Sequence, residues 1–160
     1  MTDAAFAPFR DALDRDAALR VLRAATKGAD DGELFLERRR SETLAFDDGR
    51  LKTASYDASE GFGLRAVRGE VAGYAHSTDI SASALTRAAE TARLAVGDGG
   101  GTWADAPTPT NKRLYTDIDP IAGASFPVKV ETLRQIDAYA RGLDGRVVQV
   151  SAVIAASHQE

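Results

Sequence analysis

The feature that most constrains this chain is a series of extended segments joined by very short turns between residues 33 and 77. Asp48-Gly49 is a strong signal for a two-residue hairpin turn, and Arg68-Gly69 marks a second tight turn. Strands joined by such short turns pair antiparallel, because a parallel neighbour needs a long crossover connection. We therefore expect a meander of four or five strands in this part of the chain.

The expected strands follow the hydrophobic pattern. The first begins at Glu33 and continues, or resumes after a bulge near Ser41, as far as Asp47; the following segments are 50–56, 61–67 and 70–76. A further strand is expected at 146–157, because its apolar residues alternate on one face. These residues are Val148, Val150, Ala152, Ile154 and Ala156.

Three segments have helical periodicity. The first runs from about 15 to 27, with Asp14 as its N-cap and Gly28 just past its end. The second follows Ser81 and stops at Gly97, and its apolar stripe is mostly alanine, which lets the helix lie close to its partner. The third covers about 127–142, and the residues expected to face inward are Val130, Leu133, Ile136 and Ala140.

A run of strands followed by helices indicates an α+β fold rather than an alternating α/β fold. We expect one antiparallel sheet of about five strands, with the helices packed mainly on one face. Between the second and third helices, residues 97–111 form a long loop rich in glycine, proline and threonine that contains Trp103, the only tryptophan. Loops of this length are usually functional or disordered.

Composition excludes several classes of protein. The 160 residues include no cysteine and two histidines, and the net charge is −4. A disulfide scaffold and thiol catalysis are therefore impossible, and the acidic balance argues against a protein that coats nucleic acid. No apolar run is long enough for a membrane span, and residues 1–8 lack the features of a signal peptide. We expect a cytoplasmic domain that binds neither nucleic acid nor membrane.

Several short motifs have a structural interpretation beside a chemical one. Residues 61–66 fit a dinucleotide fingerprint, but they lead into a strand rather than a helix, so we interpret the glycines as sites of close backbone approach. The basic run at 37–40 is interpreted as a solvated strand edge. His76 is expected to be packed or hydrogen-bonded. Five aspartates are interpreted as turn residues or as residues approaching a helix, rather than as a metal cluster: Asp47, Asp48, Asp79, Asp117 and Asp119.

One long stretch carries a set of fixed offsets. An acidic-Gly hairpin is followed by Lys-x-x-Ser, by Gly-x-Gly-hydrophobic-Arg, by Gly-x-x-x-Gly-aromatic-Ala and by Asp-hydrophobic-Ser at the start of a helix. The residues that carry it are Asp48, Gly49, Lys52, Ser55, Gly61, Gly63, Arg65, Gly69, Gly73, Tyr74, Asp79 and Ser81. This pattern resembles the N-terminal domain of the TldD-type members of the TldD/PmbA family. Weaker likeness covers the rest of the chain.

The resemblance implies an enzymatic activity whose active-site motif is absent from this chain. Members of the family are zinc metallopeptidases, historically called modulators of DNA gyrase. Their zinc site is a His-Glu-x-x-x-His motif with a further cysteine ligand in the C-terminal half, where the Glu activates zinc-bound water. This chain has neither the motif nor a cysteine. The resemblance thus implies that residues 1–160 are the N-terminal domain of a longer protein, without a cofactor or activity of their own, and that zinc belongs to an absent C-terminal catalytic domain.

By the same resemblance, this domain borders the cavity that leads to the zinc and contributes to a dimer. The implied partners are its own C-terminal domain, a TldE/PmbA-like or identical subunit, and an unfolded peptide held by main-chain bonding to an exposed strand edge. The alternative is a stand-alone interaction module that modulates a partner such as DNA gyrase. Autonomous hydrolysis lacks a nucleophile–base pair in any motif.

The residues expected to matter for that role are Arg65, Tyr74 and Asp79, with three glycines that shape the backbone: Gly61, Gly63 and Gly73. Each of the first three also has a purely structural interpretation. Arg65 would pair with an acidic neighbour, Tyr74 would belong to the core, and Asp79 would help to cap the helix that follows Ser81.

Overall fold

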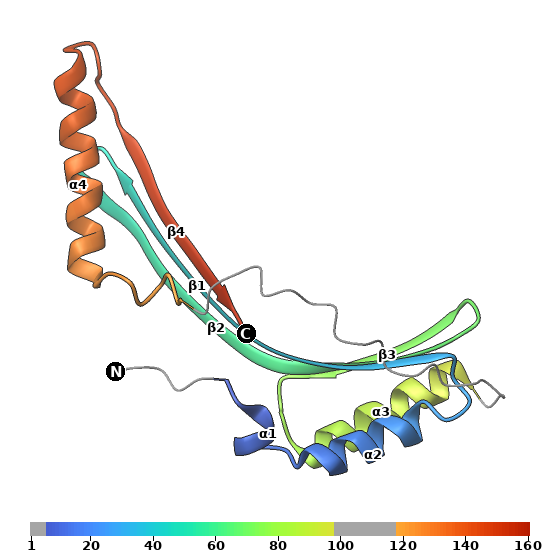
Figure 1. Ribbon diagram of the computed structural model, residues 1–160. Coiled ribbons are helices and arrows are strands. Elements are labelled where there is room, and N and C mark those ends of the chain that lie inside the picture. Colours follow the sequence, from blue (N-terminus) through green and yellow to red (C-terminus); the bar gives the residue numbers. More distant parts are fainter. Residues whose placement is uncertain (1–5, 98–117) are drawn as a thin grey trace. The chain divides into compact units, whose positions relative to one another are not determined.

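The structure is a computed structural model that describes residues 6–97 and 118–160, so the expected loop at 97–111 and Trp103 fall outside the described residues apart from Gly97. The α+β class is confirmed (Figure 1). The helices are α1 (Pro8–Asp11), α2 (Arg15–Ala25), α3 (Ala82–Val96) and α4 (Phe126–Leu143). The strands are β1 (Asp31–Asp47), β2 (Arg50–Arg68), β3 (Val71–Ser77) and β4 (Ser151–Gln159).

The strands form one antiparallel sheet of four strands in the order β3-β2-β1-β4. Both predicted hairpins are present. Asp48 and Gly49 have φ values of 48° and 75°, as a type I′ turn requires, and Gly69 has a φ of 56°, as a type II′ turn requires at its first central position. Glycine tolerates these angles because it has no Cβ.

The expected number of about five strands is one too high. Segments 50–56 and 61–67 belong to a single continuous strand, β2, and β1 is also continuous through Ser41. Residues 57–60, which interrupt the hydrophobic pattern, do not end β2. Their side chains are exposed, so polar and small residues cost little at these positions.

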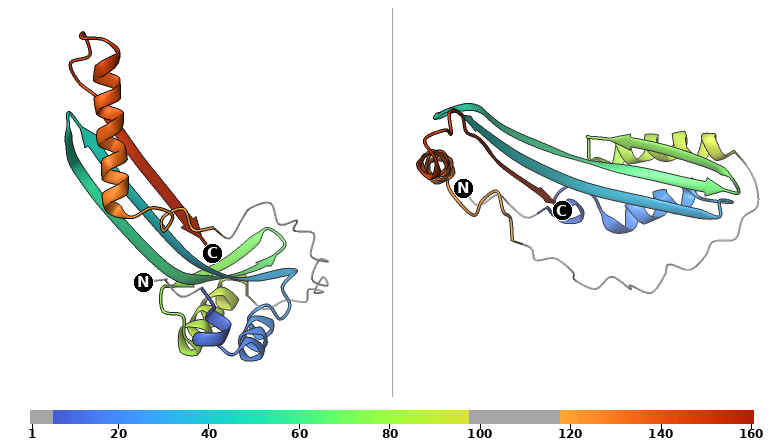
Figure 2. Two further views of the ribbon diagram at one scale, coloured as in Figure 1. Left: turned by 60° about the vertical axis from the view of Figure 1, so that its left-hand side comes forward. Right: turned by 90° about the horizontal axis from the view of Figure 1, so that it is seen from above.

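The chain divides into two compact units. The first comprises residues 1–38 and 60–112, and the second comprises 39–59 and 113–160. In the first unit, α2 and α3 lie side by side against the strands and form its core (Figure 2). The core includes Leu22, Phe62, Leu64 and Leu85 together with the buried alanines of α2 and α3.

The predicted helix caps of the first unit are confirmed. The Asp14 side chain accepts a hydrogen bond from the backbone N–H of Ala17 at 2.7 Å, and the Ser81 side chain accepts one from Ala84 at 3.2 Å. The first helix ends at Ala25, slightly before the expected residue, and Gly97 caps α3 with a φ of 70°. The sheet and these caps fix the start of α3 directly after β3.

In the second unit, α4 packs along β4, and the core consists of Leu44, Phe46 and Leu133. The predicted inward face of α4 is wrong at Ile136, which is 45% exposed. The buried positions are Lys129, Leu133 and Asp137, spaced at i, i+4 and i+8. Charged residues occupy this face because each has a partner in the same unit.

Lys129 shows how that partnership works. Its ammonium group donates to the Glu42 carboxylate and, at 2.6 Å, to the backbone carbonyl of Ile121. Asp137 likewise accepts a hydrogen bond from Arg141 at 3.1 Å. Buried charges are tolerated when they are paired and hydrogen-bonded in this way.

The interpretation of the basic run as a solvated edge is wrong for Arg40. Strand β1 is an inner strand of the sheet, and Arg40 is 7% exposed. Its guanidinium lies 3.2 Å from the Asp119 carboxylate and 3.0 Å from Nδ1 of His158, which belongs to β4. The sequence gives no local signal for this cluster, because its members are far apart along the chain.

The expected last strand is shorter than predicted and begins at Ser151. Its half-buried face is formed by Ala152, Ile154 and Ala156, as the alternation predicts, but Val148 precedes the strand and is 82% exposed. That the helices pack mainly on one face of the sheet stays a prediction. None of the helices in the described ranges is long and apolar enough to cross a membrane.

Candidate functional site

Two of the predicted site residues lie directly opposite each other in the first unit. Arg65 on β2 is paired in register with Tyr74 on β3. Both are exposed, and Tyr74, at 61%, is not a core residue. Arg65 forms a charge pair with Glu33 at 3.9 Å, which agrees with the structural interpretation of that arginine.

The ring of Tyr74 covers the backbone at Gly63. A Cβ built on Gly63 would lie 2.7 Å from the Tyr74 hydroxyl oxygen, so this glycine leaves room for the ring. His76 stacks on the same ring with a centroid distance of 5.7 Å and is exposed rather than packed in the core. Tyr74, His76 and Arg65 thus form one polar, aromatic face of the sheet.

The other two predicted glycines lie against main-chain atoms rather than against a side chain. A Cβ on Gly73 would lie 2.3 Å from the carbonyl oxygen of Ala92 in α3, and a Cβ on Gly61 would lie 2.5 Å from the carbonyl oxygen of Ser77. Both distances are far below van der Waals contact, so only glycine fits. This agrees with the interpretation of these glycines as sites of close backbone approach.

Asp79 lies apart from that face, just before α3. Its carboxylate accepts a hydrogen bond from the Ser81 hydroxyl at 3.0 Å, and its N–H donates to the Ser77 hydroxyl at 3.0 Å. It also lines a pocket of about 470 Å³ with residues that include Arg38 and Glu60. The structure therefore does not bring Asp79 together with Arg65 and Tyr74.

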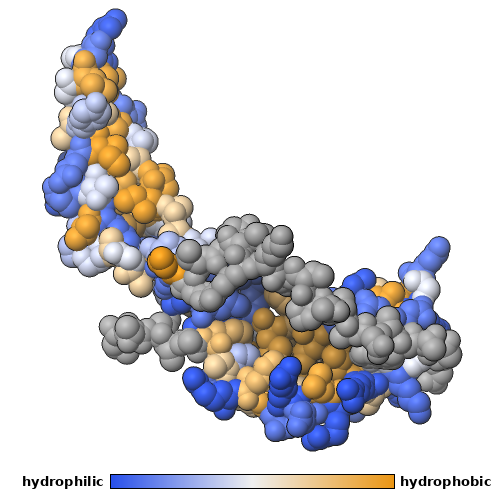
Figure 3. All heavy atoms as spheres, in the orientation of Figure 1, coloured by the Kyte–Doolittle hydropathy of each residue, from blue (hydrophilic) through white to orange (hydrophobic). Residues whose placement is uncertain are grey.

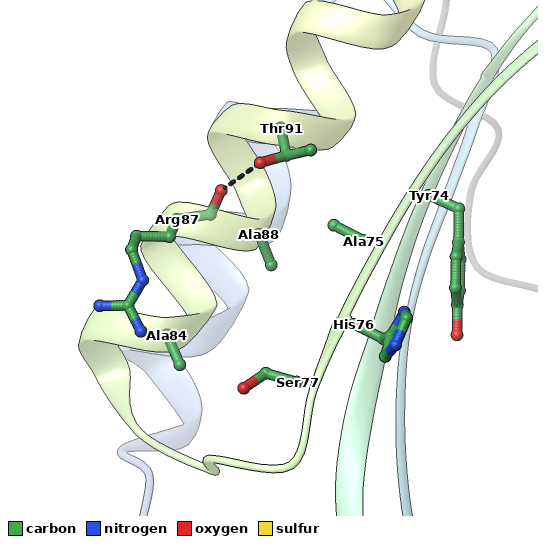
Figure 4. Close-up of a pocket in the computed structure, with 8 residues that line it drawn as sticks. All are labelled: Tyr74, Ala75, His76, Ser77, Ala84, Arg87, Ala88 and Thr91. Atoms are coloured by element: carbon green, nitrogen blue, oxygen red, sulfur yellow. Dashed lines mark hydrogen bonds between the residues drawn. The ribbon is translucent and has the colours of Figure 1, made fainter.

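A second cavity, of about 510 Å³, follows β3 and α3, and we call it the β3–α3 groove. Figure 4 shows Ala75 and Ser77 pointing from β3 towards α3, whereas Tyr74 and His76 point to the opposite side of the strand. The remaining lining residues come from α3 and are Ala84, Arg87, Ala88 and Thr91. Arg87 is the one residue of formal charge among them.

The helix residues of this groove were not among the residues expected from the sequence to matter for function. Ala84, Ala88 and Thr91 are spaced at i, i+4 and i+7, so they share one stripe of α3, and the two alanines of this stripe also belong to the buried core. That spacing is a usable signal in retrospect. The predicted alanine-rich stripe pointed to close packing, but it did not say on which side space remains.

The second unit carries an exposed apolar surface. Val128, Ile136, Tyr139 and Leu143 are each at least 45% exposed and follow one stripe of α4. Figure 3 shows hydrophobic side chains on the visible face of this unit. Exposed apolar stripes of this kind mark contact surfaces.

Zinc does not fit the residues that the structure describes. Within 6–97 and 118–160, no group of three or more histidine, aspartate or glutamate side chains is arranged to hold a metal ion. The chain also supplies no thiolate ligand. A zinc site in a further domain stays a prediction.

The comparisons with known proteins agree with this architecture. Residues 32–96 match the family model described as PmbA/TldA metallopeptidase domain 1. Over these residues the chain is therefore similar to the first domain of the TldD/PmbA family.

Two curated relatives are similar over most of this chain. A metalloprotease TldD homolog from Buchnera aphidicola subsp. Acyrthosiphon pisum is 28% identical over 148 residues, covering 92% of this chain and 31% of the relative. A metalloprotease TldD homolog from Haemophilus influenzae is 29% identical over 137 residues, covering 84% of this chain and 28% of the relative. The chain thus spans about a third or less of the length of these relatives.

Solved structures share the fold. TldE from Thermococcus kodakarensis matches with a TM-score of 0.62 and 18% identity, over 89% of this chain and 34% of that one. A candidate modulator of DNA gyrase from Bacteroides thetaiotaomicron matches with a TM-score of 0.63 and 14% identity, over 91% of this chain and 35% of that one. At these identities the likeness supports the fold alone.

Proposed function

We propose that this chain is the non-catalytic N-terminal domain of a TldD-like zinc metallopeptidase. In that role it helps to form the cavity through which peptide substrate reaches the catalytic domain, and it contributes to a dimer with an identical or TldE/PmbA-like subunit. The observation that carries the proposal is the match of residues 32–96 to the first domain of a metallopeptidase family.

Two surfaces support these two roles, access of the substrate and formation of the dimer. The β3–α3 groove offers space for substrate in the first unit, and the apolar stripe of α4 offers a contact surface for a subunit or for the catalytic domain in the second. The similarity of the fold to TldE is in keeping with a partner that is built alike.

The test compares three proteins made from the source gene. These are the 160-residue chain, the complete polypeptide, and the polypeptide without the chain. The proposal expects the chain alone to contain no stoichiometric zinc and to cleave nothing, the complete protein to hydrolyse an unfolded substrate such as β-casein, and the deletion variant to lose that hydrolysis. Stoichiometric zinc or peptidase activity in the chain alone would overturn the proposal.

The alternative, a stand-alone module, has its own signature. A stop codon directly after the codon for Glu160 would favour it, whereas a downstream His-Glu-x-x-x-His sequence favours the peptidase.

The assembly role is tested with Tyr139→Lys in the complete protein, since Tyr139 is 71% exposed on the apolar stripe. Sedimentation should show a weakened dimer for Tyr139→Lys and an unchanged one for the control Arg134→Lys, a charge-conserving change on the same helix.

A further inference from the structure

The solvent-facing side of α2 carries a stripe of like charges. The buried residues of this helix lie on its other side, against the core of the first unit. Arg20 and Arg23 on the helix and Lys27 in the turn that follows it are exposed and spaced at i, i+3 and i+7. Asp16, four residues before Arg20, begins the same stripe. We call these four residues the α2 stripe, and along the chain its charges read minus, plus, plus, plus.

The three cations of the α2 stripe are not neutralised within the fold. None of their side chains forms a hydrogen bond or an ion pair with another residue in the part of the chain that the structure describes. Their nearest neighbours have the same charge, because Arg23 is three residues from Arg20 and four from Lys27. Like charges at these spacings destabilise a helix. An external anion that lies along the stripe would relieve this repulsion.

The helix dipole explains only part of the positive charge on α2. Cations are favourable at the C-terminal end of a helix, so Arg23 and Lys27 suit the fold. Arg20 lies in the middle of α2, where the effect of either end has faded. Arg15 occupies the first position of the helix, where the positive end of the dipole disfavours a cation. The helix therefore carries more positive charge than its own stability requires, and a binding surface accounts for the excess.

The order of the charges decides which anion fits the stripe. A nucleic-acid duplex presents a continuous row of phosphates, which would meet the carboxylate of Asp16 and a chain of net charge −4. A membrane-surface helix also needs an apolar face to insert, but Leu19, at 39%, is the one large hydrophobic residue that α2 exposes. A protein helix with glutamates at i, i+4 and i+7 and a lysine at i+11 matches all four charges when it lies antiparallel, because the spacing of the stripe is the same from either end.

We propose that the α2 stripe is a docking surface for an acidic helix of a partner protein. Three carboxylates of the partner lie against Arg20, Arg23 and Lys27, and one cation lies against Asp16. Ion pairs between exposed groups add affinity in small steps and chiefly accelerate association, so this contact is weak, selective and sensitive to salt. The proposal goes beyond the proposed function and does not depend on it, since no residue of the stripe lines the β3–α3 groove.

The test uses a fluorescein-labelled, alanine-based peptide of about 20 residues with the Glu, Glu, Glu, Lys pattern, a length at which such sequences are helical. It is titrated with the 160-residue chain and followed by fluorescence anisotropy. The key variant combines Arg20→Gln, Arg23→Gln and Lys27→Gln, because glutamine retains a high helix propensity. Binding should weaken about tenfold, since each of three exposed ion pairs contributes a factor of about two or more. Binding by the unchanged chain should also be lost at about 1 M salt, where the screening length is about 3 Å.

A second triple variant controls for the change in net charge. Arg50→Gln, Lys52→Gln and Arg134→Gln remove three positive charges from exposed positions of the second unit. This variant should bind the peptide as the unchanged chain does. Equal losses in the two triple variants, or no loss in the first, would overturn the proposal.

A single variant distinguishes a matched helix from other anions. Asp16→Asn should weaken binding of the lysine-containing peptide about twofold and leave binding of a peptide with glutamine in place of that lysine unchanged. Duplex DNA and vesicles of anionic lipid are the competing probes. Tighter binding of either one than of the peptide, lost in the first triple variant, assigns the stripe to that partner and overturns the proposal. Self-association of the chain that the same variant abolishes in sedimentation makes a second copy the occupant, which overturns it too.

Discussion

Replacing Lys129 with methionine should strongly destabilise the second unit. The Lys129 side chain is 8% exposed and that of its partner Glu42 is 14% exposed. Lys129→Met leaves the Glu42 carboxylate buried without its counter-charge and deprives the Ile121 carbonyl of a donor at 2.6 Å. Breaking a buried pair from one side typically costs about 3–5 kcal/mol, so we expect a loss of about 3 kcal/mol of unfolding free energy.

Hydrogen exchange measured by mass spectrometry checks this locally. A loss of about 3 kcal/mol corresponds to exchange of the α4 amides that is about a hundredfold faster, since about 1.4 kcal/mol is a factor of ten. The matched control is Arg134→Met on the same helix, because the Arg134–Glu131 pair is 3.7 Å long and largely exposed. Such pairs contribute at most about 1 kcal/mol.

A double variant distinguishes the charge from the packing. Lys129→Met combined with Glu42→Leu removes the orphaned charge and should recover stability to within about 1 kcal/mol of the unchanged chain. If Lys129→Met behaves like Arg134→Met, or if the double variant is less stable than the single one, the Lys129–Glu42 pair does not hold α4 to β1.

Three other outcomes are expected in thermal unfolding of the chain. Gly73→Ala should lose about 1–3 kcal/mol, because its Cβ would lie 2.3 Å from the Ala92 carbonyl oxygen, whereas Gly142→Ala, with open space around its Cβ, should gain about 0.5 kcal/mol from helix propensity. Hydrogen bonds, above all from Ser151, lower the pKa of Asp47. The stability that Asp47 contributes is thus present above its unfolded pKa of about 4 and is lost as the pH falls through the lower folded value. Asp47→Asn should flatten this acid dependence of the melting temperature.

The fold was predictable where local chemistry determines it. Asp48-Gly49 and Gly69 require turn conformations that few other residues adopt, and the side chains of Asp14 and Ser81 cap their helices through contacts three residues away. Such signals lie within one stretch of sequence. The length of β2 was not predictable in the same way, because its exposed middle segment gains its order from pairing with β1 rather than from its own pattern.

The same distinction explains the errors in the second unit. Hydrophobicity alone predicts that Ile136 lies on the buried face of α4 and that Lys129 does not. In the structure, Lys129 is buried and Ile136 is exposed. The inward position of Lys129 depends on Glu42, and that of Arg40 depends on Asp119. Both partners are distant in sequence, so only the tertiary structure shows that these charges are satisfied.

The alanines of α3 connect the core of the first unit to the β3–α3 groove. The sequence predicted that a stripe of small residues lets this helix approach its partner, and the contact between Gly73 and Ala92 shows how close the approach is. The same small side chains at Ala84 and Ala88 cannot fill the space beside β3. Close packing of the helix and the open groove beside it therefore have one cause, and substituting larger residues at Ala84 or Ala88, which also belong to the buried core, should fill the groove and disturb the packing of α3.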